Sequence, residues 1–395
     1  MAFSQQTTST TGPTRGEVLA AIMMGGLGVT QVVAMPLLAT LIAGAFHVEG
    51  AGSGLVGLAN LLGTAVGSLF VTVWLKRLPF RLTAILSVLL ACTAQLGVAF
   101  MPGFNEAVLM EALAGVGAGV LLALSAAIVG ASANPDRGFA FILTLQAVIA
   151  VIVLLAIPVL GGASSFLLVA TFLAGVQALL MPVSVALGQN PMLAPLQNAY
   201  EQNASTFHTA VLLKAAAYFT FSAAVGVLWV FSGILGSMAG LADGSIGQAL
   251  AVGNIAAIAG SLLAAIITSR FGRIGPVLAV CLTLALSVVL LTAQMGIVRF
   301  YAASSLFLFA WGGGLPLLMG IVAEVDPTER VTSLLPVLAF AGMGVGPALV
   351  GLVPAAYGLF QQVSATTIGL VLLAFLLFVI THLRWSLPMQ SRSTE

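Results

Sequence analysis

Long apolar runs that no charged residue interrupts dominate this sequence and constrain its fold more than any other feature. A helix needs about 20 mostly apolar residues in succession to cross a membrane. Only 6% of the residues are charged, whereas an ordinary soluble domain has about 25%. So few charges cannot cover the surface of a soluble protein of this length, and the sequence therefore predicts an all-α protein embedded in a lipid bilayer.

Charges and clusters of Pro and Gly divide the apolar sequence into twelve expected spans. The spans cover residues 17–46, 52–75, 82–100, 104–132, 139–160, 163–186, 209–236, 244–269, 275–296, 300–325, 331–358 and 363–383. The polar stretch between the sixth and seventh spans, residues 187–208, is rich in Asn, Gln and Pro and is predicted to be a linker. We therefore expect six-helix bundles over 17–186 and 209–385, with cytosolic tails at 1–16 and 386–395.

The positions of the cationic residues predict the orientation of the chain. Eleven of the twelve Lys and Arg residues lie at the N-terminal side of the expected membrane, and only Arg299 lies at the other side. Cytoplasmic loops carry the excess of Lys and Arg, so both termini are predicted to be cytoplasmic in a bacterial-type inner membrane. The net charge of +1 gives no basic field for nucleic acid.

Three landmarks recur in the same order in the two halves of the sequence. Gly67-Ser-Leu lines up with Gly260-Ser-Leu at an offset of 193 residues, and Pro135 lines up with Pro327 at an offset of 192. Pro158 in the fifth span corresponds to a proline in the eleventh. The chain therefore reads as a duplicated six-span unit, and parallel repeats of this kind place a substrate site at their interface near the membrane midplane.

Several motifs resemble those of the major facilitator superfamily over residues 17–385. The loops after the second and eighth spans read Trp74-Leu-Lys-Arg-Leu-Pro-Phe-Arg81 and Ser269-Arg-Phe-Gly-Arg273, and the fourth span contains Glu111-Ala-Leu-Ala-Gly115-Val-Gly117-Ala118. The eleventh span contains Gly342-Met-Gly-Val-Gly346-Pro347, which is similar to a run found in the fifth span of antiporters in the family. The resemblance implies two six-helix bundles related by a pseudo-two-fold axis.

The sequence also departs from the family pattern. The usual acidic residue of the basic loop is replaced by Lys76 in one half and Ser269 in the other, and the usual Arg of the fourth span is Glu111. A carboxyl group at membrane depth is costly and typical of proton pathways, because burial disfavours its charged form. Glu111 is therefore predicted to be the proton-coupling residue. A structural carboxyl group, bonded to a neighbouring helix or reaching the outer interface, is the alternative.

Small residues and prolines are predicted to let the inner helices bend. Gly115 and Gly119 share a face with Glu111, so another helix can approach closely there. Three glycines and a proline within six residues weaken helical hydrogen bonding in the tenth span. The predicted bending residues are Gly115, Gly119, Gly312, Gly313, Gly314, Pro316, Gly346 and Pro347. Close packing is the alternative for Gly115 and Gly119, and a passive kink is the alternative for the glycines and proline of the tenth span.

Neutral polar and aromatic residues in the spans that line the cavity of this fold are predicted to bind the solute. They are Gln31, Gln146, Tyr218, Trp229, Asn254 and Trp311. Interhelical hydrogen bonds or interfacial aromatic positions would explain each of them equally well. Gln95, Gln177 and Gln294 lie in spans that face lipid or flank the core in the family, and are excluded on that ground.

Charged residues on the N-terminal side are predicted to form a gate of ion pairs that change between conformations. The candidates are Arg77, Asp136, Arg137, Arg270, Arg273, Glu324, Asp326 and Arg330. Exposed pairs contribute only about 0–1 kcal/mol each, so the gate would have to act as a network.

Together these features predict a proton-coupled secondary transporter, and the proton gradient rather than a cofactor or metal would drive it. No nucleotide-binding loop is present, and few cations lie at cavity depth to bind polyanions. A small neutral, lipophilic or cationic organic solute is therefore expected, with export favoured over import and a monomer as the working unit. A metabolite uptake symporter, and a membrane sensor or enzyme that moves no solute, are the alternatives.

Overall fold

The computed structural model describes residues 12–160, 166–188, 209–326 and 330–390, and these residues fold into helices joined by short turns. The first six spans are α1 (Arg15–Leu27) with α2 (Thr30–Ala45), η1 (Gly50–Gly54) with α3 (Leu55–Trp74), α4 (Phe80–Val98), α5 (Phe104–Gly130), α6 (Pro135–Val159), and α7 (Phe166–Ala178) with α8 (Leu180–Ala186). The next six are α10 (Thr209–Met238), α11 (Asp243–Phe271), α12 (Ile274–Leu290), α13 (Ile297–Ala323), α14 (Arg330–Leu349) and α15 (Leu359–Gln390). Short 3₁₀ turns follow α3 at η2 (Leu75–Arg77) and α14 at η4 (Val350–Leu352) and η5 (Ala355–Tyr357).

The twelve predicted spans are all occupied by apolar helices. Eleven helical segments of the described chain are long and apolar enough to cross a membrane, and α12 is a shorter apolar helix of 17 residues. The prediction of an all-α membrane protein with two six-helix bundles is therefore confirmed.

Two differences from the predicted spans concern the first and the last of them. The first span is interrupted by a two-residue turn at Gly28 and Val29 between α1 and α2, although the Gly28 N–H still donates to the Met24 carbonyl at 2.9 Å. The last helix continues to Gln390, beyond the predicted start of the tail at residue 386. The predicted linker lies almost wholly outside the described residues.

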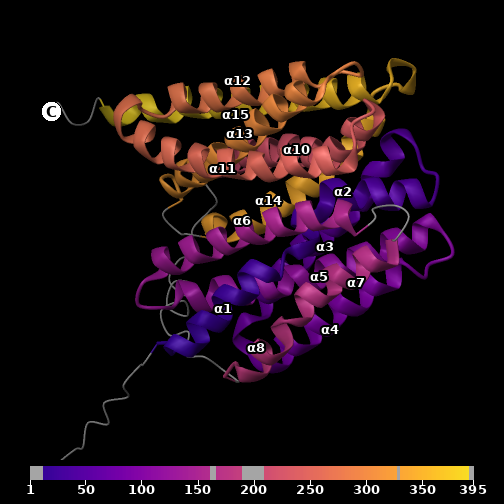
Figure 1. The fold of residues 1–395 in the computed structure, drawn as a ribbon. Coiled ribbons are helices and arrows are strands. Elements are labelled where there is room, and N and C mark those ends of the chain that lie inside the picture. Colours follow the sequence, from indigo (N-terminus) through magenta and orange to yellow (C-terminus); the bar gives the residue numbers. More distant parts are fainter. Residues whose placement is uncertain (1–11, 161–165, 189–208, 327–329, 391–395) are drawn as a thin grey trace, which may run out of the picture.

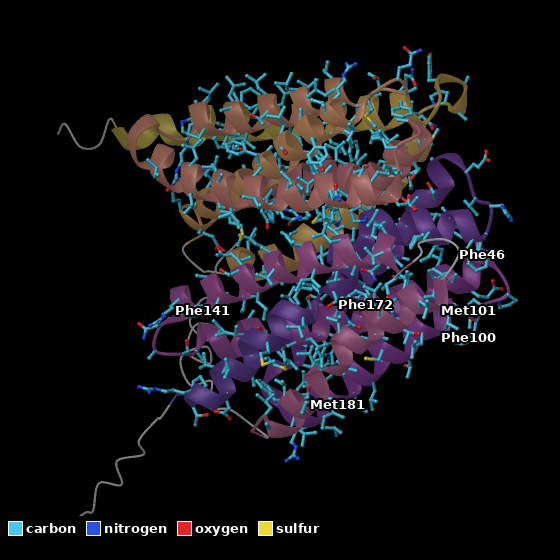
Figure 2. The ribbon with its side chains drawn as sticks, in the orientation of Figure 1. Phe46, Phe100, Met101, Phe141, Phe172 and Met181 are labelled. Atoms are coloured by element: carbon cyan, nitrogen blue, oxygen red, sulfur yellow. The ribbon has the colours of Figure 1, made fainter. Side chains whose placement is uncertain are left out.

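Figure 1 shows the two bundles one above the other, with α1–α8 below and α10–α15 above. The chain enters α1 and leaves α15 at the same end, which we call the terminal face, and the other end is called the opposite face. Phe141, near the start of α6, lies at the terminal face, whereas Phe46 and Met101 lie at the opposite face (Figure 2). The two basic loops, after α3 and after α11, both belong to the terminal face because an even number of spans precedes each.

The internal repeat extends to individual hydrogen bonds. The Ser68 hydroxyl donates to the Gly119 carbonyl at 3.1 Å, and the Ser261 hydroxyl donates to the Gly312 carbonyl at 2.6 Å. Both members of the second pair lie 193 residues after those of the first, the offset that the sequence predicts. The crossing of α3 with α5 is therefore repeated as the crossing of α11 with α13.

Candidate functional site

A buried carboxyl group lies inside the first bundle, between α3, α4 and α5. The Glu111 side chain is fully buried on α5, and Asn60 of α3 donates to its Oε2 atom at 3.0 Å. Asn60 also donates to the backbone carbonyl of Glu111 at 3.3 Å. Gln95 of α4, likewise fully buried, lies beside the same carboxyl group. Both neighbours are neutral amides.

The hydrogen-bonding capacity of this cluster is not used up. Within the described chain, Glu111 Oε1 and Asn60 Oδ1 have no hydrogen-bond partner, and the Gln95 amide lies beside the carboxyl group without a hydrogen bond of standard geometry. Buried polar atoms without partners are uncommon in folded proteins, and each calls for an explanation. An amide can both donate and accept, so Asn60 and Gln95 can serve a carboxyl group in either protonation state.

The second bundle shows what the same helix crossing looks like without the carboxyl group. At the offset of 193, Ser304 corresponds to Glu111 and Gly253 corresponds to Asn60. A Cβ atom on Gly253 would lie 3.1 Å from the Ser304 carbonyl oxygen, so the two backbones already touch. The equivalent crossing in the second bundle therefore packs without a buried carboxyl group.

The glycines predicted to permit bending lie where two helices touch. A Cβ atom on Gly115 would collide with the Asn60 carbonyl, and one on Gly119 with the Thr64 carbonyl. On α13, a Cβ atom on Gly312 would collide with the Ala257 carbonyl. Gly313, Gly314 and Gly346 are similarly packed against Gly260, Phe221 and Ala223. All of these glycines permit close packing, and α13 runs through its glycines and Pro316 as a continuous helix.

Prolines inside the spans free backbone carbonyls, and neighbouring helices contact these carbonyls. Proline has no N–H group, so the carbonyl four residues earlier loses its helical donor. Pro316 frees the Gly312 carbonyl, which accepts from Ser261. Pro347 frees the Met343 carbonyl, against which Gly226 of α10 packs.

The most informative of these freed carbonyls joins the two bundles. Pro36 in α2 frees the Val32 carbonyl, and the indole N–H of Trp229 in α10 donates to it at 2.8 Å. A second freed carbonyl also meets the other bundle. Pro158 in α6 frees the Leu154 carbonyl, and Gly247 of α11 lies directly against it.

Trp229 also belongs to an aromatic cluster with two residues of α13. Its ring centroid lies 5.1 Å from that of Trp311 and 6.4 Å from that of Phe307. Trp229 and Tyr218 are 1% exposed, whereas Trp311 is partly exposed. Of the predicted aromatic solute-binding residues, Trp311 therefore presents the most accessible surface in this conformation.

The predicted polar solute-binding residues are engaged with the protein. Gln31 and Gln177 donate to each other across α2 and α7, and Gln177 also donates to the Gly28 carbonyl at 3.1 Å, where the first span is broken. Gln146 donates to the Gly25 carbonyl at 2.9 Å. Asn254 is partly exposed and donates to the Leu250 carbonyl of its own helix at 2.9 Å.

Sequence reasoning excluded Gln95 and Gln177 from the solute site because their spans face lipid or flank the core in the family, and the structure turns both side chains toward the interior. Both side chains are fully buried inside the first bundle. Asn60 was missed altogether, although a signal was available. It begins a stripe of small and polar residues on α3, spaced for one helix face, that consists of Asn60, Gly63, Thr64, Gly67 and Ser68.

The described gate residues contact partners within their own half. Arg273 and Glu324 form an ion pair between the start of α12 and the end of α13. The guanidinium groups of Arg77 and Arg137 lie over the rings of Trp74 and Phe141, at 5.4 and 5.5 Å from the ring centroids. Asp326 accepts from the backbone N–H groups of Val331 and Thr332 at 2.9 and 2.8 Å, as a cap of α14. The side chains of Asp136, Arg270 and Arg330 lie outside the described set.

Backbone contacts between the two bundles are found toward the opposite face. Near the end of α10, a Cβ atom on Gly233 would collide with the Pro36 carbonyl. Near the start of α3, Gly54 lies against Phe231 and Gly57 against Val230. Gly247 near the start of α11 makes the α6 contact described above. The bundles are therefore tightly joined at the opposite face.

Solved structures share this architecture. No family model and no curated protein sequence matches the chain. The nucleoside transporter NupG aligns over 92% of this chain and 98% of its own, with a TM-score of 0.72 and 16% identity. A bacterial homologue of the human lysosomal transporter Spinster, in an inward-facing and unoccupied conformation, aligns over 92% and 96%, with a TM-score of 0.71 and 14% identity. The human organic anion transporter MFSD10 aligns over 92% and 99%, with a TM-score of 0.61 and 18% identity.

These likenesses define the class of fold. The chain has the twelve-helix fold of these transporters, which is the major facilitator fold that the sequence motifs predicted.

Proposed function

We propose that the chain is a proton-coupled secondary transporter of the major facilitator superfamily. It moves a small neutral, lipophilic or cationic organic solute by alternating access and has no enzymatic activity. The fold shared with transporters supports the general class. The observation that carries the proton coupling is the fully buried Glu111, which has no counterpart at the equivalent position of the second bundle, Ser304.

Glu111 binds and releases the proton in this scheme. An ionised carboxylate away from water is expensive unless it is paired, and its contacting side chains, Asn60 and Gln95, are neutral. The protonated form is satisfied when its O–H donates to an amide oxygen, and the ionised form when an amide N–H turns toward it. Both protonation states can therefore be satisfied by reorientation of the two neighbouring amides.

In this scheme the terminal face is the cytoplasmic face, and the conformation described here is the one closed at the opposite face. The joined opposite face supports this assignment, together with the gate residues that engage partners in their own half. In the other conformation, charges of the two halves exchange these local partners for partners across the interface. Because the Gly346-Pro347 run is similar to that of antiporters, export is favoured over uptake.

Glu111→Gln tests the coupling, because it removes titration but keeps the size and hydrogen-bonding capacity of the side chain. Glu106→Gln, five residues nearer the start of α5 and exposed, is the matched control. Proteoliposomes with an imposed pH gradient are screened with lipophilic cations and neutral solutes, and solute accumulation and internal pH are followed together. Binding is measured separately by thermal shift of the detergent-solubilised protein.

Glu111→Gln should abolish gradient-driven accumulation and the accompanying proton flux, while binding and gradient-free exchange persist. Glu106→Gln should behave as the wild type. Accumulation by Glu111→Gln at the wild-type level would exclude this residue from coupling. Absence of any solute flux by the wild type, with binding retained, would favour a sensor over a transporter.

A further inference from the structure

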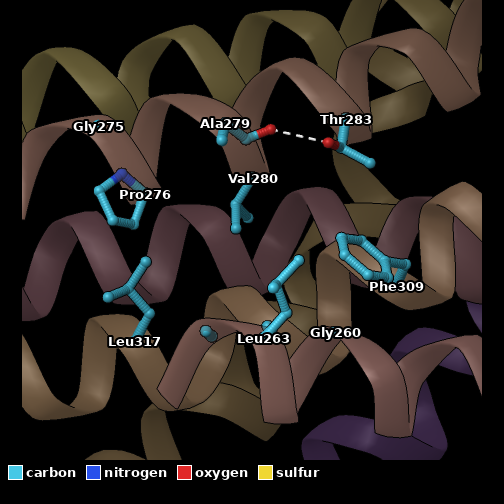
Figure 3. Close-up of a pocket in the computed structure, with 11 residues that line it drawn as sticks. Gly260, Leu263, Gly275, Pro276, Ala279, Val280, Thr283, Phe309 and Leu317 are labelled. Atoms are coloured by element: carbon cyan, nitrogen blue, oxygen red, sulfur yellow. Dashed lines mark hydrogen bonds between the residues drawn. The ribbon is translucent and has the colours of Figure 1, made fainter. Parts of the chain in front are cut away.

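A cavity of about 230 Å³ lies within the second bundle between α11, α12 and α13 (Figure 3). It is separate from Glu111 and from the contacts between the two bundles. Figure 1 places α12 on the side of the second bundle farthest from the first. The cavity walls include Gly260, Leu263, Gly275, Ala279, Phe309 and Gly313.

The walls of this cavity offer almost nothing polar to a ligand. The hydroxyl group of Thr283 is turned into its own helix, where it donates to the Ala279 carbonyl at 2.8 Å (Figure 3). Leu263 and Leu317 point into the space from one side, and Pro276 and Val280 from the other. The chemistry of the cavity therefore favours a hydrocarbon ligand, held by burial of apolar surface and by dispersion contacts.

The cavity adjoins the outer surface of the bundle. Helix α12 packs chiefly on α13 and α15, so its side toward α11 is only loosely covered. Leu263 is 43% exposed, and Leu282 on the neighbouring turn of α12 is 59% exposed. Since α11, α12 and α13 are membrane spans, the surroundings of this surface are lipid chains.

The length of the cavity matches one leaflet of the bilayer. It extends along α12 from Gly275 in the first turn to Thr283, which is about 12 Å at the rise of an α-helix. Half of a hydrocarbon core about 30 Å thick is about 15 Å. The cavity therefore begins near the terminal face and ends close to the membrane midplane, beside Phe309.

The first bundle lacks the small residues that open this space. At the offset of 193, leucines stand where the second bundle has the small wall residues of α12. The replaced pairs are Leu82 for Gly275, Leu86 for Ala279 and Leu90 for Thr283. The burial pattern of α4 and α12 agrees with this alignment, since Ala84, Val88 and Ala91 correspond to the buried Val277, Cys281 and Leu284.

We propose that this cavity binds one acyl chain of a membrane phospholipid from the leaflet at the terminal face. The apolar walls select a hydrocarbon, the lateral position gives access from the bilayer, and the length fits a chain running along the membrane normal. The bound chain lies against Gly260 and Gly313, where α11 crosses α13.

Photolabelling in nanodiscs tests the proposal with the full chain. The nanodiscs contain a phosphatidylcholine that carries a diazirine in the middle of one acyl chain, and labelled peptides are mapped by mass spectrometry. In the blocking variant, the three wall residues of α12 are replaced by the leucines found at the equivalent positions of the first bundle. The substitutions are Gly275→Leu, Ala279→Leu and Thr283→Leu. A Cβ atom on Gly275 meets no atom within 4 Å, so the first change is accommodated. Val289→Leu, on an exposed part of α12 away from the cavity, is the control.

In the wild type, label should concentrate on the wall residues of α12 and α13. It should fall by about fivefold or more in the blocking variant, because the leucines remove the contacts that retain the chain. Val289→Leu should label as the wild type. Equal labelling of the wild type and the blocking variant, or wild-type labelling no stronger on α12 than on α4, would overturn the proposal. If the triple variant fails to fold, Ala279→Leu alone, at an exposed position, gives the same comparison.

Discussion

Replacing Trp229 by Phe should weaken the closure of the opposite face. The change removes the indole N–H that donates to the Val32 carbonyl, while an aromatic ring remains against Trp311. Val32 is 5% exposed, and Pro36 has no N–H group to donate to the Val32 carbonyl. In the Trp229→Phe variant the Val32 carbonyl is therefore left buried without a donor.

The expected magnitude follows from this loss. Leaving a buried acceptor unsatisfied costs about 1–3 kcal/mol, whereas interhelical hydrogen bonds in membranes average about 0.6 kcal/mol and reach about 1.7 kcal/mol. A loss of about 1–2 kcal/mol is therefore expected, since α2 itself cannot replace the donor. Because the bond joins the two halves, this loss reduces the population closed at the opposite face by about 5- to 30-fold relative to the open one.

Spin labels at Ala45 on α2 and Met238 on α10, both exposed, report the closure through distances measured by electron paramagnetic resonance. Trp229→Phe should transfer population to longer distances, and Trp311→Phe should do so far less. Pro36→Ala restores the N–H group that the Val32 carbonyl lacks. In that background Trp229→Phe should have little effect, and an equal effect in both backgrounds would refute the reasoning.

Two further predictions concern stability. Gly119→Ala and Gly312→Ala should each lower thermal stability in detergent by about 1–3 kcal/mol, since each Cβ atom meets a backbone carbonyl, while Gly44→Ala meets no atom within 4 Å and should be neutral. A much smaller loss at one glycine than at the other would contradict the equivalence of the two helix crossings. Glu324→Gln, which removes the partner of Arg273, should lower the free energy of unfolding by at most about 1 kcal/mol because Glu324 is half exposed. Unfolding measured at low and high salt should show that the difference in stability between variant and wild type shrinks as the salt concentration rises.

Hydropathy and the internal repeat predicted most of the fold from the sequence. Length and apolarity alone locate the spans, because the bilayer demands both. The offset of 193 predicted which residues are equivalent, and the Ser68 and Ser261 hydrogen bonds confirm it at the level of single atoms. The break in the first span at Gly28 was not predicted, since glycines in apolar helices more often permit close packing.

The rotation of each helix about its axis could not be predicted from the sequence. In a soluble protein the polar face of a helix identifies the side toward solvent, but here lipid and protein interior are both apolar. For Gln95 and Gln177 the sequence therefore left open whether the side chain faces lipid or the interior, and the structure buries both. A lone amide in an apolar helix is better taken as evidence for an interior face, because lipid offers it no hydrogen-bond partner.

In the proposed scheme, the position of Glu111 determines how proton binding reaches the solute pathway. The carboxyl group faces α3 and α4 inside the first bundle, and we infer that α3 transmits its state. Asn60 on one face of α3 contacts Glu111, and Leu62, two residues later and so on nearly the opposite face, packs against Gly344 of α14 in the other bundle. When the Glu111 carboxyl group changes its hydrogen bonds with Asn60, α3 moves, and this movement changes the packing of α3 against α14. Coupling then needs no solute-binding residue near the proton, because one rigid helix carries the proton site on one side and the interface between the halves on the other.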